Sequence, residues 1–273
     1  KIKQIKEKEM IVDKNYKYKK ELDLLQKTLK EAYKKCILNQ HKDVKIKADK
    51  SLVTNIDVNT EKYIISCIKE QFPGDNFLTE ETSSKTDLKN RTWIIDPIDG
   101  TSFFIRNALF YSIQVAFYDE GKTQLSVIYQ PKLNNSMYVA VLGHGAYLNG
   151  KCLKRKCDVK LTSSFYCINS CPSRWTEKIR NINEKLYEYE KQCYVSPKQF
   201  KIDSSGVVYT LLANGTIDFL IEPARTKWDY MPGDLLVKEA GAKYYNFDNE
   251  DFERFYSFSP ELDEYLGLTK KDK

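Results

Sequence analysis

The chain has 273 residues, of which 41% are hydrophobic and 30% charged, a size and composition that suit one large domain or two lobes sharing a core. No apolar run approaches the roughly 18 residues of a membrane span and no secretory signal is apparent, so we expect no membrane association. The net charge of +6 is spread along the chain without an arginine-rich block, which favours a lysine-rich solvated surface over a nucleic-acid interface.

The seven cysteines are an odd number and form no Cys-x-x-Cys pair. Together with the lack of a secretory signal, this pattern predicts reduced thiols in a cytoplasmic protein rather than a disulfide framework. Cys167 and Cys171 do not suggest a zinc site, because neither of the two histidines is near them.

The first elements are predicted to be two helices separated by a lysine-rich connector. Apolar residues recur every three or four positions from Leu22 to Cys36, which predicts a helix with one buried stripe. The connector at 42–50 precedes Asp57, where a second helix with isoleucines on one face is predicted to begin. An aspartate at a helix start is commonly a cap, and Pro73 lies where this helix should end.

The stretch Thr-Trp-Ile-Ile-Asp-Pro-Ile-Asp-Gly-Thr at 92–101 carries the clearest chemical pattern. Trp93 to Ile95 is a short apolar run rich in β-branched residues, which predicts a buried strand. Pro97 disfavours the helical region for Asp96, so the strand should stay extended to Asp96 before the chain turns. Carboxylates at the end of a buried strand are costly unless a cation lies between them, and Mg²⁺ is the simplest such cation because it prefers oxygen ligands.

Gly100 and Thr101 directly follow these acids. Glycine lets the backbone approach a ligand closely. Thr101 offers a hydroxyl and a backbone N–H where a helix is predicted to begin, a place that favours anions. The stretch therefore predicts a combined metal and phosphate site.

The rest of the chain predicts an antiparallel meander followed by mixed helices and strands. Glycines punctuate the turns of the meander, whose strands are predicted at 111–118, 125–130 and 137–141. The later elements are predicted to be helices at 176–189, 207–213 and 229–240 and a buried strand at 217–221. Asp229 is predicted as the N-cap of the last helix and Gly241 as its end.

Four segments in order resemble the signature of the inositol monophosphatase family, whose members are Mg²⁺-dependent, usually lithium-sensitive phosphomonoesterases. The Asp-Pro-Ile-Asp-Gly-Thr stretch that ends at Thr101 is one of them. The others are Leu52–Asp57, Phe77–Glu81 and Trp228–Asp229 with Glu239–Ala242. Together they extend over about residues 45–245, which makes chance similarity an inadequate explanation.

The resemblance implies an α/β (α+β) fold, the layered α/β/α/β/α sandwich of the inositol monophosphatase or sugar phosphatase type. An N-terminal α+β lobe at 1–155 would carry most metal ligands, and a C-terminal α/β lobe at 156–273 would complete the substrate cleft. The resemblance also implies about two or three Mg²⁺ ions, inhibition by Li⁺ and a homodimer.

The same resemblance implies a role for each signature residue. Asp57 and Thr101 would orient the attacking water, with Glu80 also taking part in catalysis, and Gly100 and Thr101 would hold the phosphate. Glu81 is expected to support Glu80 rather than to bind the metal itself, because the side chains of neighbours on an extended chain point to opposite faces. The metal ligands would be Glu80, Asp96, the Ile98 carbonyl, Asp99 and Asp229. The remaining substrate contacts would be Asp99, Ser204, Ser205, Glu222 and Asp229.

The lysine-rich connector has two interpretations: an exposed loop, or a segment that brings Lys45 or Lys47 near the phosphate, as the family suggests. Thr79 and Ala242 stand where the family usually has glycine, changes that would affect the shape of the cleft more than its metal ligands.

The predicted substrate is a small phosphorylated metabolite, inositol 1-phosphate first. Arg225 and Lys227 could meet a second phosphate, which supports 3′(2′),5′-bisphosphate nucleotidase activity as an alternative. Fructose-1,6-bisphosphatase activity is a third alternative within the same chemistry. An alternative from another class is a regulatory member of the fold that binds RNA or a protein, although the intact set of acids argues for catalysis.

Overall fold

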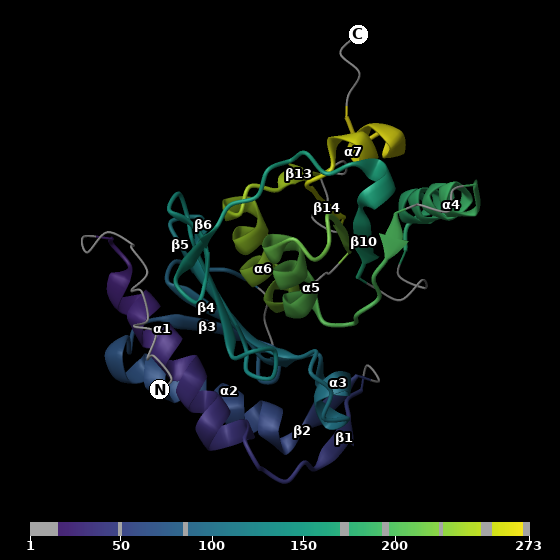
Figure 1. Cartoon of the computed structure of the whole chain (residues 1–273). Coiled ribbons are helices and arrows are strands. Elements are labelled where there is room, and N and C mark those ends of the chain that lie inside the picture. Colours follow the sequence, from purple (N-terminus) through teal and green to yellow (C-terminus); the bar gives the residue numbers. More distant parts are fainter. Residues whose placement is uncertain are drawn as a thin grey trace, which may run out of the picture.

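The computed structural model describes residues 16–48, 51–83, 87–169, 175–192, 197–223, 226–246 and 253–269. These residues form successive layers of helix, sheet, helix, sheet and helix (Figure 1), which confirms the predicted layered α/β/α/β/α sandwich. Separate apolar cores fill the spaces between the layers.

The first sheet is a mainly antiparallel meander. Only β3 and β4 run parallel, and from β4 onward each strand pairs with the next one along the chain, so the predicted meander is confirmed. Its seven strands are β3 (Asn76–Thr79), β4 (Thr92–Asp99), β5 (Ser112–Asp119), β6 (Lys122–Gln130), β7 (Ser136–Val141), β8 (Gly145–Leu148) and β9 (Lys151–Leu153).

One face of this sheet is covered by helix α1 (Lys19–Ala32), its π-helical continuation η1 (Tyr33–Ile37) and helix α2 (Asn55–Gln71). The apolar stripe predicted from residue 22 onward is fully buried along α1 and belongs to the same core as Trp93 of β4. Burial of this stripe, rather than intrinsic propensity alone, stabilises such a lysine-rich helix.

Helix α2 begins two residues before the predicted start, so Asp57 is its third residue and not its cap. The N-cap is Thr54, at the end of a hairpin of β1 (Val44–Ile46) and β2 (Leu52–Thr54). The Thr54 hydroxyl accepts the N–H of Asp57 at 3.4 Å, and the Asp57 carboxylate accepts the N–H of Thr54 at 2.9 Å. This reciprocal capping box outcompetes a start at Asp57 because it satisfies two backbone donors.

The second sheet has five strands in the spatial order β11-β10-β12-β14-β13. Its strands are β10 (Phe165–Ile168), β11 (Lys198–Gln199), β12 (Phe219–Glu222), β13 (Lys243–Tyr245) and β14 (Arg254–Ser257). Helices α5 (Ser205–Asn214) and α6 (Lys227–Glu239) lie between the two sheets (Figure 1), while α4 (Glu177–Gln192) and α7 (Pro260–Leu266) pack on the other face of the second sheet. The short elements are α3 (Thr101–Ile105) and the 3₁₀ turn η2 (Leu161–Ser163).

The prediction that Asp229 caps α6 is wrong. Thr226 is the N-cap, and Asp229 is the third helical residue, with its carboxylate accepting a hydrogen bond from the Thr226 hydroxyl. Further along α6, a Cβ added to Gly233 would lie 2.0 Å from the ring of Tyr209 on α5. This close approach of the two helices therefore requires glycine.

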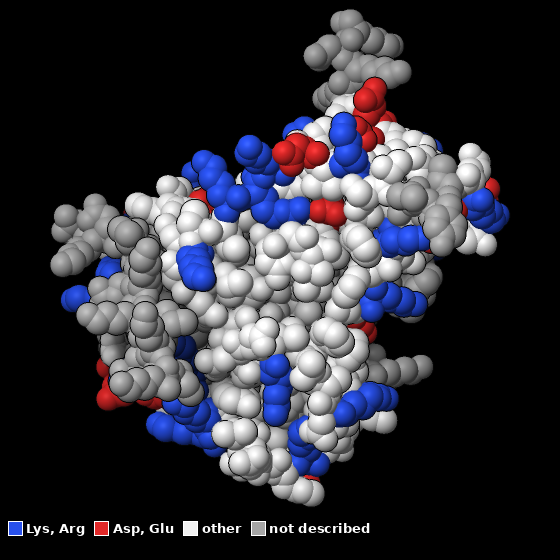
Figure 2. Space-filling view, in the orientation of Figure 1, with Lys and Arg blue, Asp and Glu red and all other residues white. Residues whose placement is uncertain are grey.

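On the face shown in Figure 2, one group of Lys and Arg side chains lies along the upper edge beside acidic side chains, and most of the others are separated by uncharged surface. In the part of the chain that the structure describes, no helix is long and apolar enough to cross a membrane. The described cysteines are free thiols, as predicted; they are Cys36, Cys67, Cys152, Cys157 and Cys167.

Candidate active site

The two aspartates of the Asp-rich stretch lie at one end of β4, where every residue of the strand is buried. The strand does not end at Asp96 as predicted but continues to Asp99, and its register with β5 shifts between these two residues. Pro97 explains both findings, because its fixed φ keeps the chain extended while its missing N–H interrupts the ladder. Both acids are thereby withdrawn from solvent at the same strand end.

Asp96 is 1% exposed and has few hydrogen bonds for a buried acid. One carboxylate oxygen accepts the N–H of Ile98 at 3.1 Å, and the other accepts the side-chain amide of Gln114 at 3.3 Å. Burial raises the pKa of Asp96 well above its usual value, and the nearby charges of Glu80, Asp99 and Asp229 raise it further. Gln114, missed by the sequence reasoning, is opposite Asp96 on β5, and a polar residue inside that apolar run was its signal.

Asp99 joins the end of β4 to the start of α5. Its Oδ2 accepts hydrogen bonds from Ser112 Oγ at 3.0 Å, Ser204 Oγ at 2.5 Å and the N–H of Gly206 at 2.9 Å, and its Oδ1 accepts the N–H of Ser205 at 3.0 Å. Burial raises the pKa of Asp99 to about 6, although these hydrogen bonds act in the opposite direction. Oδ1 accepts a single hydrogen bond in this arrangement, so it retains a lone pair for a cation.

The Thr101 hydroxyl lies between two acceptors just beyond the strand end. It is 3.2 Å from Asp57 Oδ1 and 3.1 Å from the carbonyl oxygen of Ile98. Burial raises the pKa of Asp57 to about 6, against the lowering effect of the hydrogen bonds from Thr54. Gly100 allows this turn because its φ is +86° and because an added Cβ would lie 2.9 Å from the carbonyl oxygen of Phe110.

Glu80 follows β3 and contacts a lysine from the connector. Lys47 Nζ lies 2.9 Å from carboxylate oxygens of both Glu80 and Glu81, whereas Lys45 is exposed on the β1–β2 hairpin. Burial and the charge of Glu80 raise the pKa of Glu81 to about 7, although Lys47 lowers it. Glu61 of α2, a further residue missed by the sequence reasoning, is fully buried and accepts the N–H of Glu81 at 2.9 Å. Lys47 and Glu61 therefore hold the Glu80 loop from two sides.

A polar group on the second sheet faces the start of α5. Glu222, at the end of β12, is 1% exposed and accepts a hydrogen bond from the side-chain amide of Asn169 at 2.5 Å. The same amide donates to the Ser205 hydroxyl at 3.0 Å, so Asn169 brings two predicted substrate contacts together. Asn169 Oδ1 has no hydrogen-bond partner among the described residues. Sequence reasoning missed Asn169, whose signal was an amide directly after the apolar run of β10.

Two predicted contacts have other surroundings. Ser204 is the N-cap of α5, and its hydroxyl donates its proton to Asp99. It therefore holds Asp99 in place and has no proton left to donate to a substrate. Lys227 is the first residue of α6, and Arg225 lies outside the described residues.

The donor atoms in this region fit a hard divalent cation. Glu80, Asp96, Asp99, Asp229 and the Ile98 carbonyl offer oxygen only, which is the preference of Mg²⁺. Burial and then the charges of Glu80, Asp99 and Asp229 raise the pKa of Asp96, and a bound cation would act against both effects. Within the described ranges, no three Asp, Glu, His or Cys side chains are placed closely enough to enclose an ion, so the carboxylates would converge upon binding it.

Comparison with known proteins identifies the family. The model of the inositol monophosphatase family matches residues 16–265. The inositol-1-monophosphatase of Bacillus subtilis is 28% identical over 84% of this chain and 86% of its own length. Nus factor SuhB of Escherichia coli K12 is 30% identical over 71% of this chain and 72% of its own length. The solved structure of the Thermotoga maritima IMPase has a TM-score of 0.75 at 26% identity, over 91% of this chain and 96% of that chain. The chain belongs to the inositol monophosphatase family.

Proposed function

We propose that this protein is a Mg²⁺-dependent phosphomonoesterase that hydrolyses inositol 1-phosphate by direct attack of a water molecule. The observation that carries the proposal is the Thr101 hydroxyl, placed between Asp57 Oδ1 and the Ile98 carbonyl oxygen just after the strand that holds the buried Asp96. Membership of the family and the similarity to the Bacillus subtilis inositol-1-monophosphatase support the same activity.

Asp57 and Thr101 would orient and activate the water. A hydroxyl has one proton and two lone pairs, so a Thr101 hydroxyl that donates to Asp57 Oδ1 can accept a hydrogen bond from a water on its other side. With a pKa of about 6, Asp57 is ionised at neutral pH and can draw the proton along this hydrogen bond. The Thr54 N–H holds the other oxygen of Asp57, so the carboxylate keeps its orientation.

The metal ligands in this proposal are Glu80, Asp96, the Ile98 carbonyl, Asp99 Oδ1 and Asp229. Mg²⁺ bound there would neutralise phosphate charge and lower the pKa of a coordinated water. Glu80 reaches this role only when its carboxylate leaves Lys47 or is shared with it, because Lys47 Nζ is 2.9 Å from Glu80. The family resemblance also supports about two or three ions and inhibition by Li⁺.

The substrate would lie between the strand end and the second sheet. The N–H groups of Gly100 and Thr101 would hold the phosphate, and Glu222, Ser205 and Asn169 form a polar cluster that suits a polyol. Asn169 Oδ1, to which no described residue donates, would accept a hydrogen bond from a substrate hydroxyl. The family resemblance further supports a homodimer and a cytoplasmic location. Light scattering of the purified protein would test the dimer.

A regulatory role in binding RNA or protein is the second candidate, because a relative similar over most of the chain is named Nus factor SuhB. The buried acids favour hydrolysis over this role, since binding alone gives no reason to hold Asp96 and Asp99 together at a cost in free energy. The two roles make opposite predictions for Asp96→Asn: hydrolysis would be lost, whereas salt-sensitive RNA binding would survive.

The test is phosphate release from inositol 1-phosphate, adenosine 3′,5′-bisphosphate and fructose 1,6-bisphosphate, with Mg²⁺, with Mg²⁺ plus Li⁺, and with chelator. We expect inositol 1-phosphate to be preferred and Asp96→Asn to be inactive, while Asp23→Asn, an exposed acid on α1, keeps full activity. Preference for either bisphosphate would show that inositol 1-phosphate is not the substrate but would leave the proposed metal-dependent hydrolysis intact. If the metal-loaded protein releases phosphate from none of the three compounds, the phosphatase proposal is overturned and the binding role remains.

A further inference from the structure

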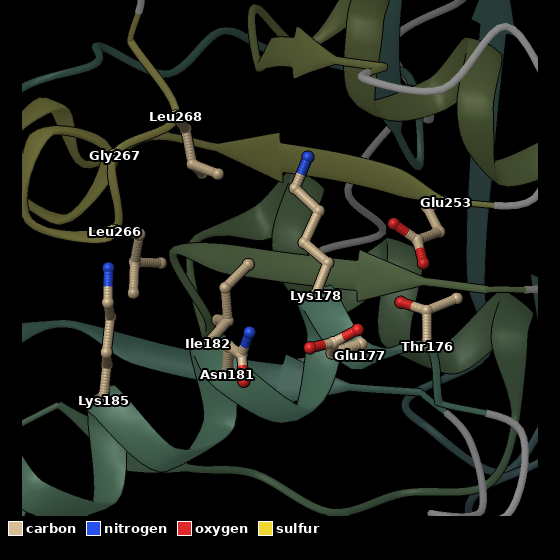
Figure 3. Close-up of a pocket in the computed structure, with 10 residues that line it drawn as sticks. All are labelled: Thr176, Glu177, Lys178, Asn181, Ile182, Lys185, Glu253, Leu266, Gly267 and Leu268. Atoms are coloured by element: carbon tan, nitrogen blue, oxygen red, sulfur yellow. The ribbon is translucent and has the colours of Figure 1, made fainter.

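A pocket of about 460 Å³ lies between α4 and the segment that follows α7, on the outer side of the second sheet. Figure 3 shows its lining residues, which come from the first turns of α4, from the residue before β14 and from the end of α7. None of them is a predicted metal ligand or substrate contact of the candidate active site. The pocket therefore needs its own explanation.

The buried polar group in this pocket is Glu253, which is 2% exposed. Both of its carboxylate oxygens are buried without a hydrogen-bond partner among the described residues, and no ion pair of the described chain includes it. In Figure 3 its carboxylate extends toward Thr176 and the middle of the pocket. Buried carboxylates are normally paired, so this one calls for a donor that the described residues do not supply.

The rest of the pocket is divided into an apolar floor and a polar rim. Ile182, Leu266 and Leu268 are 4%, 5% and 3% exposed, so an aliphatic chain could replace water against them. Thr176 and Lys185 are exposed at the rim, and the Thr176 hydroxyl already accepts the N–H of Ile179 at 3.3 Å. A lone ordered water is a poor occupant, because the floor offers few further partners for it.

We propose that this pocket binds a small aliphatic molecule that carries a protonated primary amine. The ammonium would donate to the carboxylate of Glu253, and the alkyl chain would pack on Ile182, Leu266 and Leu268. An ammonium fits better than a bare metal ion, because Glu253 is the buried carboxylate of the lining and the second lining carboxylate, Glu177, is exposed to solvent. Lys178 and Lys185, which also line the pocket, would repel a second amine and would suit an acidic group at the far end of the ligand.

The test uses the full chain and calorimetric titration at neutral pH with n-pentylamine, 6-aminohexanoate and 1-pentanol. We expect saturable binding of the amine with a Kd of about 1 mM or tighter, and binding of the uncharged alcohol at least about tenfold weaker. Tighter binding of 6-aminohexanoate than of the plain amine would identify an amino acid as the ligand class. Tighter binding of the plain amine would identify a simple alkylamine.

Two variants connect the binding to Glu253. Glu253→Gln keeps the side-chain shape and should weaken amine binding at least about tenfold, whereas Glu188→Gln, at an exposed position of the neighbouring helix α4, should leave it unchanged. Glu253→Met should abolish amine binding and raise the Tm of the ligand-free protein, because it removes a buried carboxylate to which no described residue donates a hydrogen bond. Phosphatase activity should be unchanged in all three variants.

Either of two results would overturn the proposal. One is amine binding that fails to saturate or is equal in wild-type protein and Glu253→Gln. The other is a lower Tm for Glu253→Met, which would mean that the carboxylate already has a stabilising partner within the chain.

Discussion

Replacing Thr101 by alanine is the sharpest test of the proposed chemistry. The hydroxyl is 3.2 Å from Asp57 Oδ1 and 3.1 Å from the Ile98 carbonyl oxygen, so its removal separates the proposed base from the water. Positioned general-base catalysis contributes roughly 10²–10⁴-fold to a rate, and we expect kcat to fall by about 10³-fold, or about 4 kcal/mol of transition-state stabilisation. The folded state should lose only about 1 kcal/mol, the net contribution of one hydrogen bond.

The assay is steady-state phosphate release at varied substrate and Mg²⁺ concentrations, together with thermal unfolding of the same samples. Thr101 contributes no proposed metal ligand through its side chain, so the Mg²⁺ concentration for half-maximal activity should stay close to that of the wild type. Thr101→Ser retains the hydroxyl and should keep most of kcat. The reasoning is refuted if Thr101→Ala keeps the wild-type kcat, or if its loss of activity disappears when Mg²⁺ is raised.

Three further predictions concern the surroundings of the site. Lys47→Met removes the ammonium that lies 2.9 Å from Glu80 and Glu81, so the Mg²⁺ affinity measured by calorimetry should rise about fivefold, and an unchanged affinity would show that Lys47 does not compete with the cation. Because protonated Asp57 cannot accept the hydrogen bond from Thr101, kcat should fall as the pH drops below about 6, and Thr54→Val should move this limb to higher pH because Thr54 holds the pKa down. A limb that does not move would belong to the substrate phosphate, whose second pKa is also about 6. Gly206→Ala would place a Cβ 2.3 Å from Ser112 Oγ and should cost about 2 kcal/mol in urea unfolding, whereas Gly74→Ala, which has no atom within 4 Å of the added Cβ, should cost little.

The sequence by itself was sufficient for the local features of the fold. The apolar spacing of α1, the short strand-forming runs of the meander with glycines at their turns, and the apolar run before Asp96 are each local patterns, and the structure contains all three elements. Helix starts were less well predicted. Asp57 and Asp229 are each the third residue of a helix rather than its N-cap. In both helices the N-cap is the threonine three positions earlier, and in α2 its hydroxyl also accepts backbone hydrogen bonds.

Only the tertiary structure decided which polar groups meet. Lys47 reaches Glu80 across 33 positions, Asn169 reaches Glu222 across 53 and Ser204 reaches Asp99 across 105. Likewise, only the packing of α4 and α7 beside Glu253 shows that its buried carboxylate lines a pocket and has no partner in the described part of the chain. Helix and strand periods repeat every few residues and therefore fix which face of an element is buried. They say nothing about which distant element covers that face, because this depends on how the layers pack together.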